Sequence, residues 1–249
     1  MIIIKNDMEI ELMRRAGRLV GETLAKLTEV IKPGITTAEL DRIAEEFITK
    51  HNAKPSFKGY HGFPASICAS VNEEVVHGIP SNRVLQEGDI ISVDCGAILN
   101  GYQGDAARTI PVGRVDENAL KLIEVTRESF FKGVEKAKVG NRLYDISAAI
   151  QTYVEGFGFS IVRDFVGHGI GKDMHEDPEV PNFGRPGRGP KLMNGMVLAI
   201  EPMVNIGKYT VKVQPNDWTV VTTDGSLSAH YENTVAILNN GPEILTLIP

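Results

Sequence analysis

The stretch LQEGDIISVDCGAILNGYQGDAARTI, residues 85–110, has the pattern of a β-hairpin. Apolar residues alternate around an Asn-Gly dipeptide at 100–101, which favours a two-residue turn. A hairpin centred there sets Asp105 opposite Gly96. Because strand side chains alternate between two faces, Asp94 and Asp105 are expected on one face. Two carboxylates on one face repel each other unless a cation lies between them; the alternative is that one of them points to solvent.

The first part of this stretch recurs later in the chain. LMNGMVLAIE, residues 192–201, aligns with LQEGDIISVD, residues 85–94, at an offset of 107 positions. The alignment places Glu201 on Asp94. A Glu at the end of five apolar residues is costly to bury unless it is paired or bound to metal, although it can also reach solvent from a strand end.

A helical pattern is repeated at nearly the same offset. KPGITTAELDRIAEEFITKHNA at 32–53 aligns with KVGNRLYDISAAIQTYVEGFGF at 138–159, at an offset of 106. Both have the period of an amphipathic helix after a Gly-containing break. The offset of 107 also places His168-Gly169 on His61-Gly62. Chance similarity of two amphipathic helices is the alternative, but two blocks in nearly one register favour a duplication.

The duplication predicts how the chain is organised. We expect one domain over residues 1–249, built from two similar α+β repeats at about 7–115 and 116–249. Matching strand ends would meet at a pseudo-twofold axis, where each half contributes a carboxylate.

The composition excludes several classes of protein. The chain is 42% hydrophobic and 23% charged, which is typical of a globular protein, and its net charge of -6 argues against nucleic-acid binding. No apolar run is long enough to span a membrane, and residues 1–20 have no signal-peptide core. Cys68 and Cys95 are too few for a disulfide framework, so we expect a reducing, cytoplasmic location.

Two further segments supply metal-ligand candidates. His168 lies in VGHGIGKDMHEDP, where flanking glycines allow close approach to the ring, although a lone histidine is more often structural. Glu232 lies in SAHYENTVAIL, before an apolar strand, and would be unremarkable alone. A ligand set of carboxylates with one imidazole suits two divalent cations of Mn, Fe, Co or Zn. It does not resemble a structural zinc site, which uses thiolate ligands.

These segments closely resemble blocks of the type I methionine aminopeptidases, the metalloenzymes that remove the initiator Met. The resemblance covers essentially the whole chain, in the family's order, and rests on GYHGFPASICASVNEEVVHGIP, VDCGAILNGYQGDAART, VGHGIGKDMHEDP, AIEPMVN and AHYENT. It implies the pita-bread fold, with two pseudo-symmetric halves of antiparallel sheet covered by helices. The predicted domain is then a single catalytic one, of the minimal bacterial form.

The resemblance implies a role for each of several residues. The implied metal ligands are Asp94, Asp105, His168, Glu201 and Glu232. The implied catalytic residues are Glu201, His175 and His77. The implied methionine pocket consists of Tyr60, Phe63, Cys68 and Trp218, with His77 and His175 at its edge; simple core packing is the alternative for its aromatic residues. A monovalent cation is implied near Asn72, Glu74 and Ser228. Position 174 usually carries an aromatic residue in the family, so Met174 changes one wall of the pocket.

The resemblance also implies a mechanism and partners. Two cations activate a water that attacks the carbonyl after the N-terminal Met, with Glu201 as acid/base and His175 stabilising the oxyanion. His77 contacts the scissile amide. The expected partners are the N-terminal Met of nascent chains with small second residues and, by implication, the ribosome, with the enzyme a monomer.

Three competing hypotheses remain. A proline-directed peptidase of the same fold shares the five ligands, but such enzymes usually carry a large N-terminal domain, which we do not expect here. A non-enzymatic binding protein of the fold would have lost ligands. A carboxylate-rich phosphoesterase would need basic groups near the metals, for which Arg108 and Arg163 are the nearby candidates.

Overall fold

The helices begin where the sequence supplies capping side chains. In the computed structural model, which describes residues 1–248, the side chain of Asn6 accepts from Glu9 N while Glu9 accepts from Asn6 N, so the first helix starts with a capping box. At the starts of two other helices, the side chain of Thr36 accepts from Glu39 N and that of Asp116 accepts from Ala119 N. The helices are α1 (Asp7–Val30), α2 (Thr37–Lys50), α3 (Glu117–Val134) and α4 (Leu143–Glu155), with a 3-10 turn η1 (Tyr60–Gly62).

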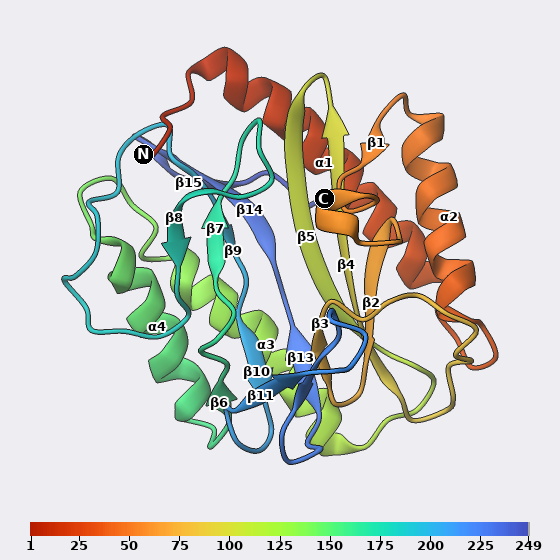
Figure 1. Ribbon diagram of the computed structural model, residues 1–249. Helices are drawn as coiled ribbons and strands as arrows, with labels where there is room; N and C mark the ends of the chain where they lie inside the picture. Colours follow the sequence, from red (N-terminus) through yellow and green to blue (C-terminus); the bar gives the residue numbers. More distant parts are fainter. Residues whose placement is uncertain (249) are drawn as a thin grey trace.

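The strands form antiparallel sheets, and the helices cover them (Figure 1). The first half of the chain contains β1 (Lys54–Pro55), β2 (Ile67–Val71), β3 (Glu74–Val76), β4 (Ile90–Leu99) and β5 (Tyr102–Pro111). The second half contains β6 (Ser160–Ile161), β7 (Gly167–Gly169), β8 (Glu176–Val180), β9 (Val197–Ile200), β10 (Met203–Asn205), β11 (Val211–Val213), β12 (Val220–Thr222), β13 (Ser228–His230), β14 (Asn233–Leu238) and β15 (Gly241–Ile244). Among the described residues, no helix is long and apolar enough to cross a membrane.

The predicted hairpin is confirmed as β4 and β5. Asn100 and Gly101 both have positive φ, 53° and 80°, as a two-residue hairpin turn of type I′ requires. Gly96 pairs with Asp105, so Asp94 and Asp105 lie on the same face of the sheet.

The two halves are pseudo-symmetric, and their backbone hydrogen bonds show the same register as the sequence repeat. Gly34 N donates to Leu85 O at 2.8 Å. Gly140 N donates to Leu192 O at 3.0 Å. Gly140 lies 106 positions after Gly34, and Leu192 lies 107 positions after Leu85. Both glycines have a φ of 97°, which other residues rarely adopt. The repeat boundaries at about 7–115 and 116–249 stay a prediction.

The predicted match of His61 with His168 is wrong. His61 lies in η1, whereas His168 lies in β7 and pairs with Ala199 of β9. The counterpart of Ala199 at an offset of 107 is Ser92, which pairs with Ser70 of β2. Ser70 is therefore the residue equivalent to His168. The constant offset fails because the segments that join each helix to these strands differ in length.

The halves meet where β5 runs beside the segment before β14. Ala107 and Glu232 exchange backbone hydrogen bonds, N to O, at 3.3 and 3.0 Å. The Thr234 hydroxyl donates to Asp105 O at 2.9 Å and accepts from Asp105 N at 3.0 Å. Each half also has its own apolar core, under α1 and α2 in the first and α3 and α4 in the second. The junction therefore lies between two packed units and fixes how their strands face each other.

Candidate active site

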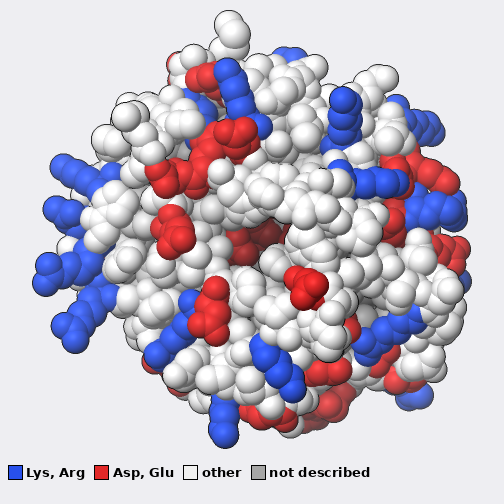
Figure 2. Space-filling model, viewed as in Figure 1, with Lys and Arg blue, Asp and Glu red and all other residues white. Residues whose placement is uncertain are grey.

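The five candidate ligands converge at this junction. Asp94 and Asp105 come from β4 and β5, His168 from β7, and Glu201 and Glu232 from the ends of β9 and β14. They line one cavity of about 240 Å³, and Figure 2 shows acidic atoms at the bottom of a hollow on this face. The cavity is lined by Phe57, Tyr60, His61, Phe63, Cys68, His77, Asp94, Asp105, His168, His175, Glu201, Trp218 and Glu232.

The carboxylates are buried together, which strongly disfavours their charged forms. Burial, together with the nearby Glu201 carboxylate, raises the pKa of Asp94 to about 7. Burial also raises the pKa of Asp105, Glu201 and Glu232 well above the usual range. Without a cation these groups would hold protons at neutral pH. A cation among them would reverse that effect and stabilise the carboxylates.

Several polar atoms of the cluster lack partners within the described chain. Oδ1 of Asp94, Oδ1 of Asp105 and Oε1 of Glu232 are buried without a hydrogen bond. Buried oxygens are normally satisfied, so these atoms need a ligand. The donor set of carboxylate oxygens and imidazole nitrogen fits a divalent cation.

The His168 ring is held in the form that a metal ligand requires. Its Nδ1 lies 2.8 Å from Gly169 O, so Nδ1 carries the proton and Nε2 keeps its lone pair. Nε2 is 3.8 Å from Asp105 Oδ2 and 3.7 Å from Glu201 Oε1. Burial lowers the pKa of His168 to about 3, so the ring is neutral.

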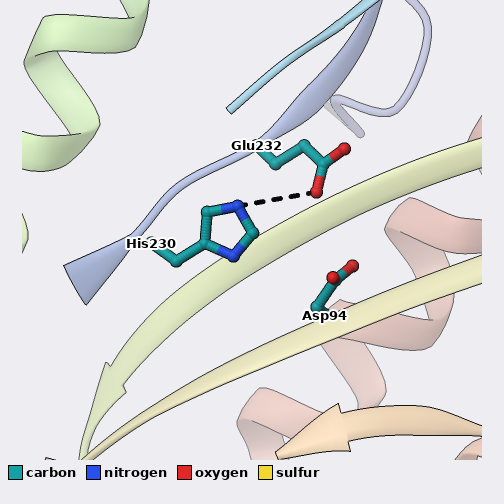
Figure 3. A group of neighbouring side chains, drawn as sticks. All are labelled: Asp94, His230 and Glu232. Carbon is teal, nitrogen blue, oxygen red and sulfur yellow. Dashed lines mark ion pairs between the residues drawn. The ribbon is translucent and has the colours of Figure 1, made fainter. Parts of the chain in front are cut away.

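A further histidine, to which the sequence analysis gave no role, lies in the same cluster. The buried His230 ring points toward Asp94 and Glu232, and its Nε2 has no hydrogen-bond partner in the described chain (Figure 3). Burial lowers its pKa to about 4. His230 lies two residues before Glu232, so a strand reading of this segment could have placed both side chains on one face.

Aromatic side chains form the outer wall of the cavity. The rings of Phe63 and Trp218 meet edge to face at 5.1 Å. Cys68 is buried beside Phe63. Phe57 also lines the cavity and was not among the sequence-based candidates. Met174 is 2% exposed and does not line the cavity itself, but the core cluster to which it belongs packs against the lining residues Phe57 and Tyr60.

His77 and His175 both line the cavity. Burial lowers the pKa of His77 to about 4, and its ring is 6.5 Å from that of Trp218. The pKa of His175 is also lowered, mainly by burial and then by His61. The Tyr60 hydroxyl lies 2.8 Å from His175 Nδ1. The rings of His175 and His168 are 4.3 Å apart. Both imidazoles are therefore neutral and close to the acidic cluster.

The residues of the predicted monovalent-cation site lie outside the lining of this cavity. Ser228 N donates to Asn72 O at 2.9 Å, so these two residues are neighbours. The carboxylate of Glu74 pairs with Arg83 at 3.0 Å and accepts from Val71 N at 2.7 Å. A cation at these residues stays a prediction.

The two arginines that could have served a phosphoesterase have other partners. Arg108 donates to Glu232 O at 2.6 Å and lies over the Tyr231 ring at 4.4 Å. Arg163 lies over the Tyr209 ring at 4.2 Å. Neither Arg108 nor Arg163 lines the cavity, so neither is placed to bind a phosphate beside the acids.

Comparison with known proteins agrees with this geometry. Residues 11–239 match the model of metallopeptidase family M24. The chain is 76% identical to a methionine aminopeptidase of Clostridium acetobutylicum over 248 residues, covering 99% of each chain. The crystal structure of a methionine aminopeptidase from Rickettsia prowazekii superposes with a TM-score of 0.98 at 44% identity, covering 99% of this chain and 100% of that one. A prolidase from Pyrococcus furiosus superposes with a TM-score of 0.80 at 25% identity, covering 99% of this chain and 66% of that one.

Proposed function

Because the chain belongs to metallopeptidase family M24, we propose that it is a divalent-metal-dependent aminopeptidase that removes N-terminal methionine. The observation that carries the proposal is the cluster of buried carboxylates at the bottom of an apolar-walled cavity. Such a cluster suits metal-assisted hydrolysis, and a walled cavity admits a chain end rather than the middle of a folded chain.

The metal centre would hold two divalent cations, of Co, Mn, Fe or Zn. The cations would be bound by Asp94, Asp105, His168, Glu201 and Glu232. When bound, they would lower the pKa of a water toward about 7 and so supply a nucleophile at neutral pH. Unpartnered carboxylate oxygens and a neutral His168 Nε2 support this assignment.

Glu201 is the acid/base of the reaction. Its two oxygens lie 3.7 Å from His168 Nε2 and 3.6 Å from His230 Nε2, so the carboxylate is central in the cluster. Glu201 accepts a proton from the attacking water and passes it to the leaving amide nitrogen.

The two cavity histidines orient and stabilise the substrate. With the Tyr60 hydroxyl donating to Nδ1, the neutral His175 ring carries its proton on Nε2 and can donate to the developing oxyanion. His77 contacts the scissile amide. A monovalent cation near Asn72, Glu74 and Ser228 supports the adjoining loop.

The apolar wall selects the methionine side chain. Tyr60, Phe63, Cys68 and Trp218 offer aromatic and sulfur contacts, and contacts between a thioether and aromatic rings contribute about 0.3–1.5 kcal/mol each. The closeness of His77 and His175 leaves little room for a second residue. We therefore expect the enzyme to prefer small second residues.

The cellular setting follows from this substrate. The enzyme acts as a monomer in the cytoplasm on nascent chains, at or near the ribosome. These are proposals about partners, and a cytoplasmic location also fits two buried, unpaired cysteines.

One assay tests the proposed function. The protein is incubated with Met-Ala-Ser and with Met-Leu-Ser, each with a divalent metal and with a chelator, and free methionine is measured. We expect release from Met-Ala-Ser only when metal is present. Release that persists in chelator would exclude metal dependence, and equal rates on both peptides would exclude the preference for small second residues.

A proline-directed substrate is the main alternative within the fold. The same assay with Ala-Pro and Met-Pro dipeptides separates the two activities. A preference for either dipeptide over Met-Ala-Ser would favour the prolidase-like activity.

A further inference from the structure

The His230 imidazole lies among the acids without a hydrogen-bond partner in the described chain. Its side chain is only 2% exposed. Nε2 lies 3.6 Å from Glu201 Oε2 and 3.7 Å from Glu232 Oε2, and it makes no hydrogen bond. Figure 3 shows the ring and the carboxylates of Asp94 and Glu232 directed at one another. Because buried polar atoms are normally satisfied, this nitrogen needs a partner that lies between it and the acids.

The strand register gives His230 an equivalent in the first half. His230 pairs with Met203, and this pairing keeps the register in which β14 pairs with β9. Met203 lies 107 positions after Gly96, the offset of the sequence repeat. Gly96 in turn pairs with Asp105. His230 therefore occupies in the second half the position that Asp105 occupies in the first.

The candidate ligand atoms fall into two groups that share one carboxylate. In each group the atoms lie within 4.8 Å of one another, and each contains one imidazole and two carboxylates. The groups are Asp94, His230 and Glu232, and Asp105, His168 and Glu232. The oxygens of Glu201 face one imidazole each. The arrangement offers a nitrogen ligand on both sides of the shared carboxylates.

We propose that His230 is a sixth metal ligand, which holds one of two divalent cations together with Asp94 and Glu232. This inference rests on the proposed metal-dependent function and adds a second nitrogen to the five ligands named there. Imidazole suits Zn, Cu, Fe and Ni, whereas carboxylate and water suit Mg and Mn. The site at His230 therefore prefers Co²⁺, Fe²⁺ or Zn²⁺ over Mn²⁺ more strongly than oxygen ligands alone would.

The first test is a calorimetric titration of the metal-free protein with Co²⁺. Wild-type protein should bind two ions. His230→Gln should keep one site unchanged and weaken the other by about 10–100-fold or more, the range found when a supporting residue of a metal site is lost. The matched control is His51→Gln, because His51 is exposed at the end of α2 and should bind Co²⁺ as wild type does.

The second test begins with a count of resonances in wild-type protein, which needs no variant. In the Co²⁺-loaded protein, each coordinated imidazole with a proton on its other nitrogen gives a solvent-exchangeable N–H proton resonance shifted far from the ordinary range. Wild-type protein should show two such resonances, and His230→Gln should lose one of them. His168→Gln should lose the other.

The outcomes separate this inference from the proposed function. Wild-type protein that binds no divalent cation would overturn both. Wild-type protein that binds Co²⁺ with one shifted N–H resonance, or a His230→Gln variant that binds two ions with wild-type affinities, would overturn the role of His230 alone. Two resonances in wild type, with one lost in His230→Gln, support it.

Discussion

The β4–β5 hairpin of the first half corresponds to the paired strands β9, β10, β13 and β14 of the second half. The two ladders keep a constant register, but only the first is formed by unbroken strands. β4 and β5 are unbroken strands of ten residues each. In the second half, the ladder is divided into β9–β14 and β10–β13, with a break at Glu201-Pro202 and at Tyr231-Glu232. Proline lacks a backbone donor, which favours the break. The backbone of Glu232 is thereby free to pair with Ala107 of the first half.

This difference shows how a duplicated fold acquires an asymmetric site. The unbroken hairpin holds Asp94 and Asp105 on a rigid face. The broken ladder frees backbone groups that join the halves and brings the longer glutamates to the same point. Equivalent positions in the two halves therefore need not have equivalent roles.

The largest expected effect concerns Asp94 and Glu201, which are equivalent in the repeat. Glu201→Gln should reduce methionine release from Met-Ala-Ser by about 10²–10⁴-fold even at saturating metal, because the acid/base is lost. Asp94→Asn should lose activity mainly through metal affinity and should recover as metal is added. The measurement is the rate of release against metal concentration.

Circular dichroism of both variants tests the fold, and Glu124→Gln on the exposed side of α3 is the control. Near-normal turnover in Glu201→Gln would remove that residue from the acid/base role.

Metal removal should make stability strongly dependent on pH. Above pH 6.5 an unfolded histidine is at most half protonated, so the lowered pKa values of the folded histidines change stability by only about 0.4 kcal/mol each up to pH 9. The carboxyl groups have raised pKa values, about 7 for Asp94, and so hold more protons when folded. The contribution of these carboxyl groups to the stability of the metal-free protein is therefore greatest below their unfolded pKa and is lost as pH rises through the folded values.

Each pH unit above the folded pKa of such a carboxyl group costs about 1.4 kcal/mol of stability, so Asp94, with a folded pKa of about 7, should lose about 2–3 kcal/mol between pH 6.5 and 9. Thermal unfolding in chelator measures it, and the loss should shrink when metal is added. A metal-free protein whose unfolding temperature is constant from pH 6.5 to 9 would contradict the raised pKa values. Asp94→Asn should lose less stability than wild type over the same range.

A smaller effect is expected where the halves join. Thr234→Val removes the hydroxyl that bonds both N and O of Asp105, and leaves buried backbone groups unpaired. We expect a loss of about 1–3 kcal/mol in the free energy of unfolding, measured with urea. Thr49→Val is the control, because its hydroxyl bonds only within α2. Equal stability of the two variants would mean that the halves do not depend on this bond.

The smallest effect concerns η1, a turn of the first half. Tyr60→Phe removes the hydroxyl that lies 2.8 Å from His175 Nδ1. One hydrogen bond contributes about 0.5–1.5 kcal/mol, so kcat/KM should fall roughly 2–13-fold, with little change in stability. Tyr209→Phe, at an exposed residue beside Arg163, is the control. An unchanged pH profile and rate in Tyr60→Phe would show that His175 needs no such partner.

The sequence could predict the elements that local patterns determine. The Asn-Gly turn fixed the register of the hairpin, and the repeat placed Asp94 and Glu201 together. The match of His61 with His168 failed because linker lengths differ between the halves. His230 was missed because its environment arises from strands distant in sequence: it pairs with Met203 and bonds through its backbone to Thr109. The strand break that leaves the Glu232 backbone free to pair with Ala107 had no clear signal in the sequence apart from Pro202.

The backbone pair between Ala107 and Glu232 has a consequence for how activity arises during folding. Each half supplies only part of the ligand set, and Glu232 reaches the acids of β4 and β5 only when the halves are docked. Two fragments cut between β5 and α3 would each be inert, and mixing them would restore metal binding only as they associate. Metal binding therefore requires that the two halves are correctly docked. A bound cation in turn stabilises the docked state and resists separation of the halves.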